Sequence, residues 1–124
     1  HPGLEFVKGD FDETKDRTLD DTLIREIGEE TGFTRNDFLL QPIRINLNLP
    51  ENFTNYIEGV HRVNYAVEVR YPPPQVRISD EHVGYKWCDF HNTVLSIGNR
   101  QPERLGDLMV FPRVFSEAQF KGYL

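Results

Sequence analysis

The sequence predicts a mixed α+β fold in which helices pack on a mixed β-sheet. One observation is a short acidic helix, expected from Thr18 to Phe33, that carries its own start and stop signals. A second is a pair of runs, Ile43–Leu49 and Tyr56–Tyr71, whose apolar and polar residues alternate as in half-buried strands that pair with each other. The 124 residues suffice for one hydrophobic core, so we expect a single domain over residues 1–124.

Capping residues delimit the predicted helix. Thr18 is a typical N-cap, and Asp21 three positions later resembles a capping box in a first turn where the helix dipole favours negative charge. Gly32 follows the last helical residue, where glycine commonly adopts the left-handed conformation. Between these ends, apolar residues at helical spacing predict one buried stripe: Leu23, Ile24 and Ile27.

The remaining elements are shorter. Leu4–Val7 and Gly84–Cys88 are predicted strands, and the prolines Pro72–Pro74 end the strand before them because proline cannot donate to a ladder. Phe90–Ile97 is a predicted helix. Ser116, with Gln119 three residues later, is the expected cap of a terminal helix. Strand, helix, strands and helix in this order agree with a sheet that helices cover.

One face of the first helix is acidic. Glu26, Glu29 and Glu30 stand at positions i, i+3 and i+4, so their carboxylates share one side of the helix. Like charges at this spacing repel, and each pair costs about 0.2–0.5 kcal/mol unless water screens the charges or a cation binds. Two interpretations follow: a solvated acidic surface, or a site for a hard divalent cation such as Mg²⁺, which prefers oxygen ligands.

The segment Arg25–Phe33, REIGEETGF, resembles the core of the Nudix box, whose pattern is G-x5-E-x7-R-E-U-x-E-E-x-G-U, with U an aliphatic or bulky residue. Upstream, Phe6–Gly9 is similar to the strand and Lys-Gly entry of that family. The resemblance implies a Nudix α/β/α sandwich with a mixed sheet. The family places one or more strands before the box, so we expect N-terminal strands to be missing from this chain.

Two features depart from the family pattern. The spacing from Gly9 to Arg25 is two residues longer than in the box, which indicates an insertion in the loop. Counting back from Arg25, the position of the box glutamate is occupied by Arg17, which can neither bind a metal ion nor pair with an arginine. Three nearby carboxylates are alternatives for that role: Glu13, Asp16 and Asp21.

The resemblance assigns roles to residues around the box. The implied ligands of Mg²⁺ or Mn²⁺ are the carbonyl of Gly9 and the carboxylates of Glu26, Glu29 and Glu30. Glu29 and Arg25 are expected to serve catalysis, with Arg25 orienting the glutamates; the alternative for Arg25 is a surface salt bridge, which contributes little. Lys8, beside the metal loop, is an expected phosphate contact or else an ordinary exposed lysine.

A second informative segment, Arg77–Trp87, is similar to asymmetrical diadenosine tetraphosphate hydrolases and to related Nudix enzymes that remove pyrophosphate from RNA 5′ ends. By this resemblance Glu81 is an additional metal ligand or a general base, His82 a phosphate contact, and Tyr85 a platform on which a base stacks. The alternatives are a solvated loop acid for Glu81, a capping side chain for His82, and packing on an edge strand for Tyr85.

Composition restricts the function classes. A net charge of −6 argues against a general polyanion binder, so a phosphate-binding role requires metal ions or a few local cations. Cys88 is the only cysteine, which excludes an internal disulfide and favours a reducing, intracellular compartment, either cytoplasm or an organelle matrix. No apolar run approaches the roughly 20 residues that cross a bilayer, so no membrane partner is expected.

Two functional hypotheses follow. The first is a Mg²⁺- or Mn²⁺-dependent pyrophosphohydrolase that cleaves a phosphate anhydride of a nucleoside polyphosphate by attack of activated water. Its expected substrate is a dinucleoside polyphosphate or a capped or triphosphorylated RNA 5′ end. The second is a Nudix-fold subunit with reduced catalysis that binds or supports partner subunits of a larger assembly, with or without RNA. Arg17, the lengthened loop and the expected absence of early strands favour the second hypothesis, and the retained glutamates favour the first.

Overall fold

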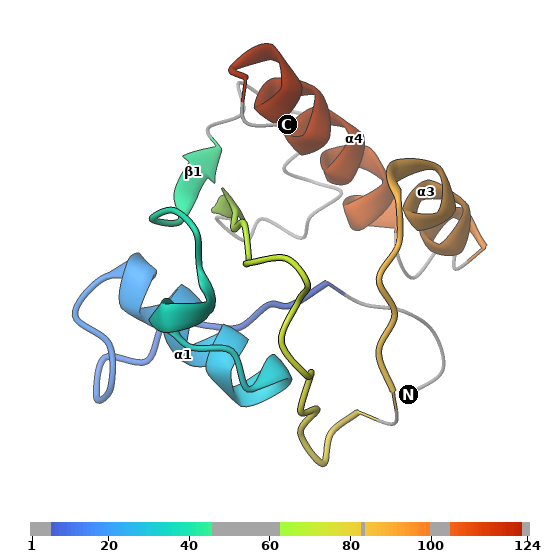
Figure 1. Cartoon of the computed structure of the whole chain (residues 1–124). Coiled ribbons are helices and arrows are strands. Elements are labelled where there is room, and N and C mark those ends of the chain that lie inside the picture. The colour runs from blue at the N-terminus through green and yellow to red at the C-terminus, as the bar shows by residue number, and fades with distance from the viewer. Residues whose placement is uncertain (1–5, 46–62, 83, 100–104, 123–124) are drawn as a thin grey trace. The chain divides into compact units, whose positions relative to one another are not determined.

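The computed structural model describes residues 6–45, 63–82, 84–99 and 105–122 of the chain. Its elements, in chain order, are α1 (Leu19–Thr31), the 3₁₀ helix η1 (Arg35–Asp37), β1 (Ile43–Ile45), β2 (Asn64–Ala66), α3 (Phe90–Gly98) and α4 (Leu105–Phe120) (Figure 1). The predicted α+β class is confirmed. The described residues form two compact units: the first contains α1, η1 and the segment Val67–Lys86, and the second contains β1, β2, α3 and α4.

Helix α1 has the ends that the sequence predicts. The hydroxyl of Thr18 accepts a 3.2 Å hydrogen bond from the N–H of Asp21, whose carboxylate accepts one from the N–H of Thr18, so the capping box is complete. Gly32 is left-handed, with φ of 79°, and its N–H donates to the carbonyl of Gly28 at 2.9 Å. The buried face includes Ile27, which is 7% exposed. These bonds satisfy backbone groups that a helix end otherwise leaves to water.

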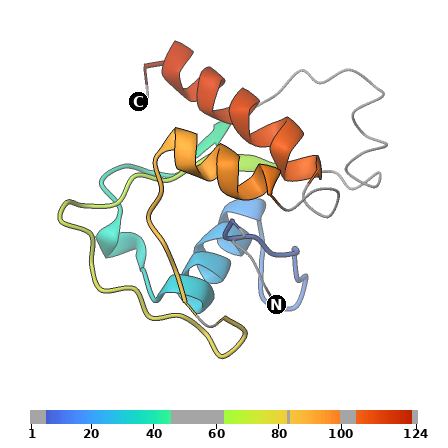
Figure 2. The same cartoon turned by 90° about the vertical axis from the view of Figure 1, so that its right-hand side faces the viewer.

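In the first unit, the segment after Val67 runs beside η1 and then reaches the C-terminal end of α1 (Figure 2). Next to η1, the N–H of Arg70 donates to the carbonyl of Asp37 at 2.9 Å, and Val69 forms an isolated antiparallel bridge with Phe38. Farther along, the N–H of Arg77 donates to the carbonyl of Thr31 at 2.7 Å. This last bond brings residues 77–82 to the acidic helix.

In the second unit, the expected pairing of the two alternating runs is confirmed. Strands β1 and β2 are antiparallel, with Ile43 opposite Ala66. Helices α3 and α4 lie side by side, and the ring of Phe90 packs 5.6 Å from that of Phe111 and 4.6 Å from that of Phe115. The buried apolar residues of this unit are Ile45, Ile97, Val110 and Ala118.

The extent of the predicted strands differs from the structure. Residues 46–49 and 56–62 of the two alternating runs, and residues 4–5 of the first predicted strand, lie outside the described residues. Phe6 and Val7 are not in a strand. The prediction of a strand at Gly84–Cys88 is wrong, because Tyr85 and Trp87 are 53% and 57% exposed and no described strand pairs with them. Alternation makes a strand only where a partner supplies the hydrogen bonds.

Of the two described helices that follow the sheet, the sequence predicts one correctly and the start of the other wrongly. The helix expected at Phe90–Ile97 is confirmed as α3, which Asp89 caps by accepting a 2.8 Å bond from the N–H of Asn92. The expected start of the terminal helix at Ser116 is wrong, since α4 begins at Leu105 and carries Ser116 in its interior. Packing of α4 against α3 outweighs the local capping pattern. Of the described helices, none combines the length and the apolar character that a bilayer crossing requires.

Candidate metal and phosphate site

A groove of about 790 Å³ lies in the first unit, over the acidic face of α1. Three segments that are far apart in the sequence line it: the loop of residues 8–14, the helix, and Glu81 from the segment that ends the unit. The predicted site residues that it brings together are Lys8, Gly9, Arg25, Glu26, Glu29 and Glu81. We call it the acidic groove.

Gly9 and Glu26 are in close contact in this groove. A Cβ atom built on Gly9 would overlap the carboxylate of Glu26, so only glycine allows this approach of loop backbone to helix. Glu26 is half-buried, and its burial raises the pKa of its carboxyl above the ordinary value, an effect that the Arg25 guanidinium opposes and the neighbouring Glu29 carboxylate reinforces. A backbone segment and a partly desolvated carboxylate therefore meet where the resemblance implies a metal site.

Arg25 is the centre of a polar network and not an isolated surface ion pair. Its Nε and Nη2 donate to the two carboxylate oxygens of Asp16 at 3.0 and 2.8 Å. Its Nη1 donates to Glu26 at 2.9 Å and lies 3.5 Å from Glu29, and its Nη2 also donates to the carbonyl of Asp10 at 3.0 Å. The Arg25 side chain is 20% exposed and that of Asp16 is 1% exposed, so solvent screens their pair little.

Of the three carboxylates that the sequence leaves as substitutes for the box glutamate, Asp16 pairs with Arg25. Asp21 instead completes the cap of α1, and its carboxylate also accepts from the N–H of Arg17 at 2.9 Å. The hydrogen bonds from Arg25 hold the pKa of Asp16 well below its usual range, while Asp16 raises the pKa of Arg25. The sequence contained a signal for this pairing. Asp16 is adjacent to Arg17, which occupies the position of the box glutamate, and the loop that carries both is two residues longer than in the family.

Glu30 is not among the residues that line the groove, but it joins both flanking segments to the helix. One carboxylate oxygen accepts from the backbone N–H of Lys8 at 3.1 Å. The other lies 3.1 Å from Nε2 of His82. The structure thus places His82, a predicted phosphate contact, on the carboxylate of a predicted metal ligand, while Tyr85 is 53% exposed and is not among the residues that line the groove.

The residues fit a hard divalent cation in donor chemistry, because they offer carboxylates and, at Gly9, a close backbone approach. Within the part of the chain that the structure describes, no group of three or more acidic, histidine or cysteine side chains is arranged to hold an ion as it stands. The contacts explain this: Arg25 bonds with Glu26 and approaches Glu29, and His82 bonds with Glu30. A cation has to compete with these partners for the carboxylates.

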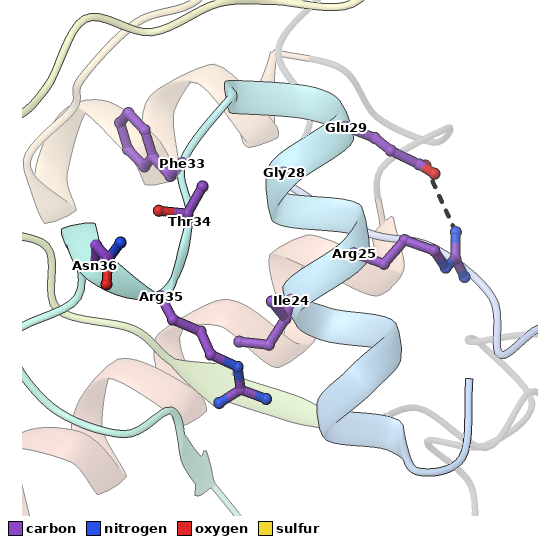
Figure 3. A pocket seen from close by; sticks show the side chains of 8 residues that line it. All are labelled: Ile24, Arg25, Gly28, Glu29, Phe33, Thr34, Arg35 and Asn36. Carbon is purple, nitrogen blue, oxygen red and sulfur yellow. Dashed lines mark hydrogen bonds and ion pairs between the residues drawn. The ribbon is translucent and has the colours of Figure 1, made fainter. Parts of the chain in front are cut away.

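A second groove, of about 520 Å³, lies between α1 and the turn that follows it. Figure 3 shows Phe33 and Thr34 on that turn, Asn36 on η1, and Ile24 and Gly28 on α1. Two predicted site residues line this groove as well: Arg25 and Glu29. The other predicted site residues lie elsewhere, so the acidic groove is the better candidate site.

Comparison of the chain with protein-family models, with curated proteins and with solved structures finds no match.

Proposed function

We propose that this protein is a Mg²⁺- or Mn²⁺-dependent hydrolase of the Nudix type, which cleaves a phosphate anhydride in a nucleoside polyphosphate. The observation that carries the proposal is the lining of the acidic groove. Residues that the Nudix resemblance names in three separate segments meet there: Lys8 and Gly9 from the loop, the α1 residues, and Glu81. The α1 residues of the groove and Glu81 are more than fifty positions apart in the sequence, so no local pattern requires them to meet.

Each predicted site residue has a role that suits its chemistry. Glu26, Glu29 and Glu30 would hold the divalent ion, with the Gly9 carbonyl beside Glu26. Such an ion supplies charge neutralisation on a polyphosphate and lowers the pKa of bound water. The exposed Glu81, which lines the groove, can accept a proton from the attacking water.

Lys8 and Arg25 supply the positive charge at the groove. Lys8 lies on its wall and can hold a phosphate oxygen as a point charge. Arg25 is fully engaged with Asp16, Glu26 and the Asp10 carbonyl, so it orients the carboxylates instead of binding substrate. This division of roles reconciles phosphate binding with a chain of net charge −6.

The substrate class follows from the Arg77–Trp87 resemblance, which favours dinucleoside polyphosphates first and capped or triphosphorylated RNA 5′ ends second. Tyr85 is 53% exposed and can offer its ring to a base, a contact that contributes about 1–3 kcal/mol in single-strand binders. The Nudix α/β/α sandwich belongs to the same proposal, as the finer form of the observed α+β class.

One observation favours the alternative, a catalytically reduced subunit that binds or supports partners in a larger assembly. The helix carboxylates already have protein partners, since Arg25 donates a hydrogen bond to Glu26 and Nε2 of His82 contacts Glu30. Internal partners of this kind satisfy an acidic cluster without any metal ion. The enzyme remains the first proposal because Gly9 and Glu81 also converge on the groove, which a purely structural network does not need.

The two proposals are separated by turnover. The protein is incubated with Mg²⁺ or Mn²⁺ and a panel of dinucleoside polyphosphates and 5′-triphosphate RNA, beside Glu29→Gln and the control Glu68→Gln. Glu29 lines the groove, whereas Glu68 is exposed and lies outside it. We expect Glu29→Gln to lose activity by about 100-fold or more and Glu68→Gln to retain it. Full activity in Glu29→Gln would exclude the proposed role, and ion binding without turnover on any substrate would favour the structural subunit.

A further inference from the structure

We propose that Asp16 is a positioning residue that limits Arg25 to one guanidinium nitrogen toward the groove carboxylates, so that Glu26 and Glu29 keep oxygens available to a divalent cation. The inference rests on the proposed function, because it concerns how that metal site stays open. It assigns to the lengthened loop of this chain the carboxylate that Arg17 cannot supply.

The Asp16 carboxylate has a full set of donors, all within the first unit. Its Oδ1 accepts from Nε of Arg25, and its Oδ2 accepts from Nη2 of Arg25, from the Thr22 hydroxyl at 2.9 Å and from the Asp12 N–H at 3.0 Å. Asp16 and Thr22 are 5% and 6% exposed. A buried carboxylate with four such bonds has one orientation available to it, so it fixes the guanidinium plane that it contacts.

The geometry leaves Arg25 a single nitrogen for the helix glutamates. Two parallel bonds to Asp16 occupy one edge of the guanidinium, and Nη1 alone reaches Glu26 at 2.9 Å and Glu29 at 3.5 Å. If Asp16 loses its charge, the guanidinium is free to turn its paired N–H groups toward Glu26 and Glu29, which are then its nearest carboxylates. A bidentate arginine is a strong competitor for carboxylate oxygens that a cation also needs.

The same carboxylate also fixes the loop that borders the groove. The Asp16 carboxylate accepts a hydrogen bond from the N–H of Asp12. The Arg25 guanidinium, which Asp16 positions, donates to the carbonyl of Asp10. Gly9, whose backbone meets Glu26, immediately precedes this anchored stretch. Loss of Asp16 therefore acts on both sides of the groove: it releases a competitor on the helix and loosens the loop opposite.

The test is a calorimetric titration of the full chain with Mn²⁺, together with thermal melts. It compares wild type, Asp16→Asn, the double variant Asp16→Asn with Arg25→Gln, and the control Asp37→Asn. Asp37 is a matched control because it also accepts from a backbone N–H and an arginine, Thr34 and Arg70, but lies outside the groove. We expect Asp16→Asn to weaken Mn²⁺ binding by roughly 10- to 100-fold, as loss of outer partners of metal ligands does. The double variant should bind Mn²⁺ more tightly than Asp16→Asn, because the competing guanidinium is gone, yet less tightly than wild type, because Arg25 no longer orients the carboxylates. Asp37→Asn should bind Mn²⁺ like wild type.

The recovery separates positioning from a merely structural role, because a variant that only damages the fold gains nothing from removal of Arg25. Unchanged Mn²⁺ affinity in Asp16→Asn, or no recovery in the double variant, would overturn this inference alone. If wild type binds no Mn²⁺, the proposed function fails and the inference with it. Should the melts show that Asp16→Asn does not fold, Asp16→Glu replaces it, because the longer side chain keeps the charge but moves the carboxylate relative to Arg25. Weaker Mn²⁺ binding than in wild type then supports the inference, and equal Mn²⁺ binding overturns it.

Discussion

Nε2 of His82 lies 3.1 Å from a carboxylate oxygen of Glu30, and this contact ties the segment that carries Glu81 to the acidic face of α1. The His82 side chain is 29% exposed and that of Glu30 14% exposed, so the contact is partly shielded from water. A backbone bond of 2.7 Å from Arg77 to Thr31 holds the same segment at the end of the helix. Together these two contacts hold the segment that carries Glu81 against α1.

The first prediction concerns this tether. His82→Ala should raise the hydrogen-exchange rate of the residue 82 amide, which donates to the Ser79 carbonyl at 3.1 Å, by roughly two- to tenfold, because the turn loses its side-chain anchor. His82→Gln keeps a donor and should change the rate less. The Arg70 amide, bonded to Asp37 at 2.9 Å beside η1, serves as the internal reference. Equal rates in wild type and His82→Ala would show that the contact does not hold the turn.

The helix that carries the site was predictable because its signals are local. Thr18 and Asp21 cap one end and Gly32 the other, and each acts on backbone groups within four residues. The i, i+3 and i+4 spacing of the glutamates follows from the helix period alone. The structure accordingly agrees with the sequence at both helix ends and at the acidic face.

The features that sequence reasoning missed depend on contacts between distant residues. Whether Asp16 or Asp21 pairs with Arg25 is decided by the path of the loop, which buries Asp16 against Thr22. The approach of His82 to Glu30 joins residues 52 positions apart. The absent strand at Gly84–Cys88 likewise reflects a missing partner and not the alternation itself.

The second prediction concerns the contact between Gly9 and Glu26. Gly9→Ala adds a Cβ that overlaps the Glu26 carboxylate and should push this side chain away from the loop. We expect the Kd for Mn²⁺ to rise by about tenfold or more, with little change in the unfolding midpoint because Gly9 is exposed and the glutamate chain can move. Gly84→Ala is the matched control, since a Cβ there meets nothing within 4 Å. A Gly9→Ala variant that binds Mn²⁺ like wild type would remove Gly9 from the site.

The third prediction compares Gly32, the C-cap of α1, with Gly28, which lies inside the helix. Gly32 has a φ of 79°, and a Cβ there would lie 3.0 Å from Cβ of Arg77, so Gly32→Ala should lower the free energy of unfolding by about 1–2 kcal/mol. Gly28 is inside the helix, and a Cβ there meets only the Phe33 carbonyl at 3.5 Å, so Gly28→Ala should raise it by about 0.5–1 kcal/mol. Urea unfolding measures both. Shifts of the same sign would contradict the left-handed cap.

The fourth prediction is a pH dependence set by Asp16. Its pKa is lowered on folding from the ordinary value of 3.8, chiefly by hydrogen bonds from Arg25, so the unfolded chain binds the proton more readily than the folded one. The stabilisation from Asp16 is therefore fully present above 3.8 and is lost as the pH falls from there toward the lower pKa of the folded state. The charges and donors that face this carboxylate are the Arg25 guanidinium, the Thr22 hydroxyl and the Asp12 N–H, and the guanidinium stays charged throughout.

Thermal midpoints of wild type and Asp16→Asn, measured from about pH 7 to about pH 2.5, test this dependence. Wild type should melt several degrees higher at neutral pH, because the asparagine cannot supply two charged acceptor oxygens to Arg25. The difference should stay constant down to about pH 5 and then narrow in acid, as wild-type Asp16 takes up its proton on unfolding. A difference that persists undiminished in acid would mean that Asp16 stabilises the fold through its shape and neutral hydrogen bonds. In that case charge pairing with Arg25 does not explain why the Asp16 carboxylate is buried.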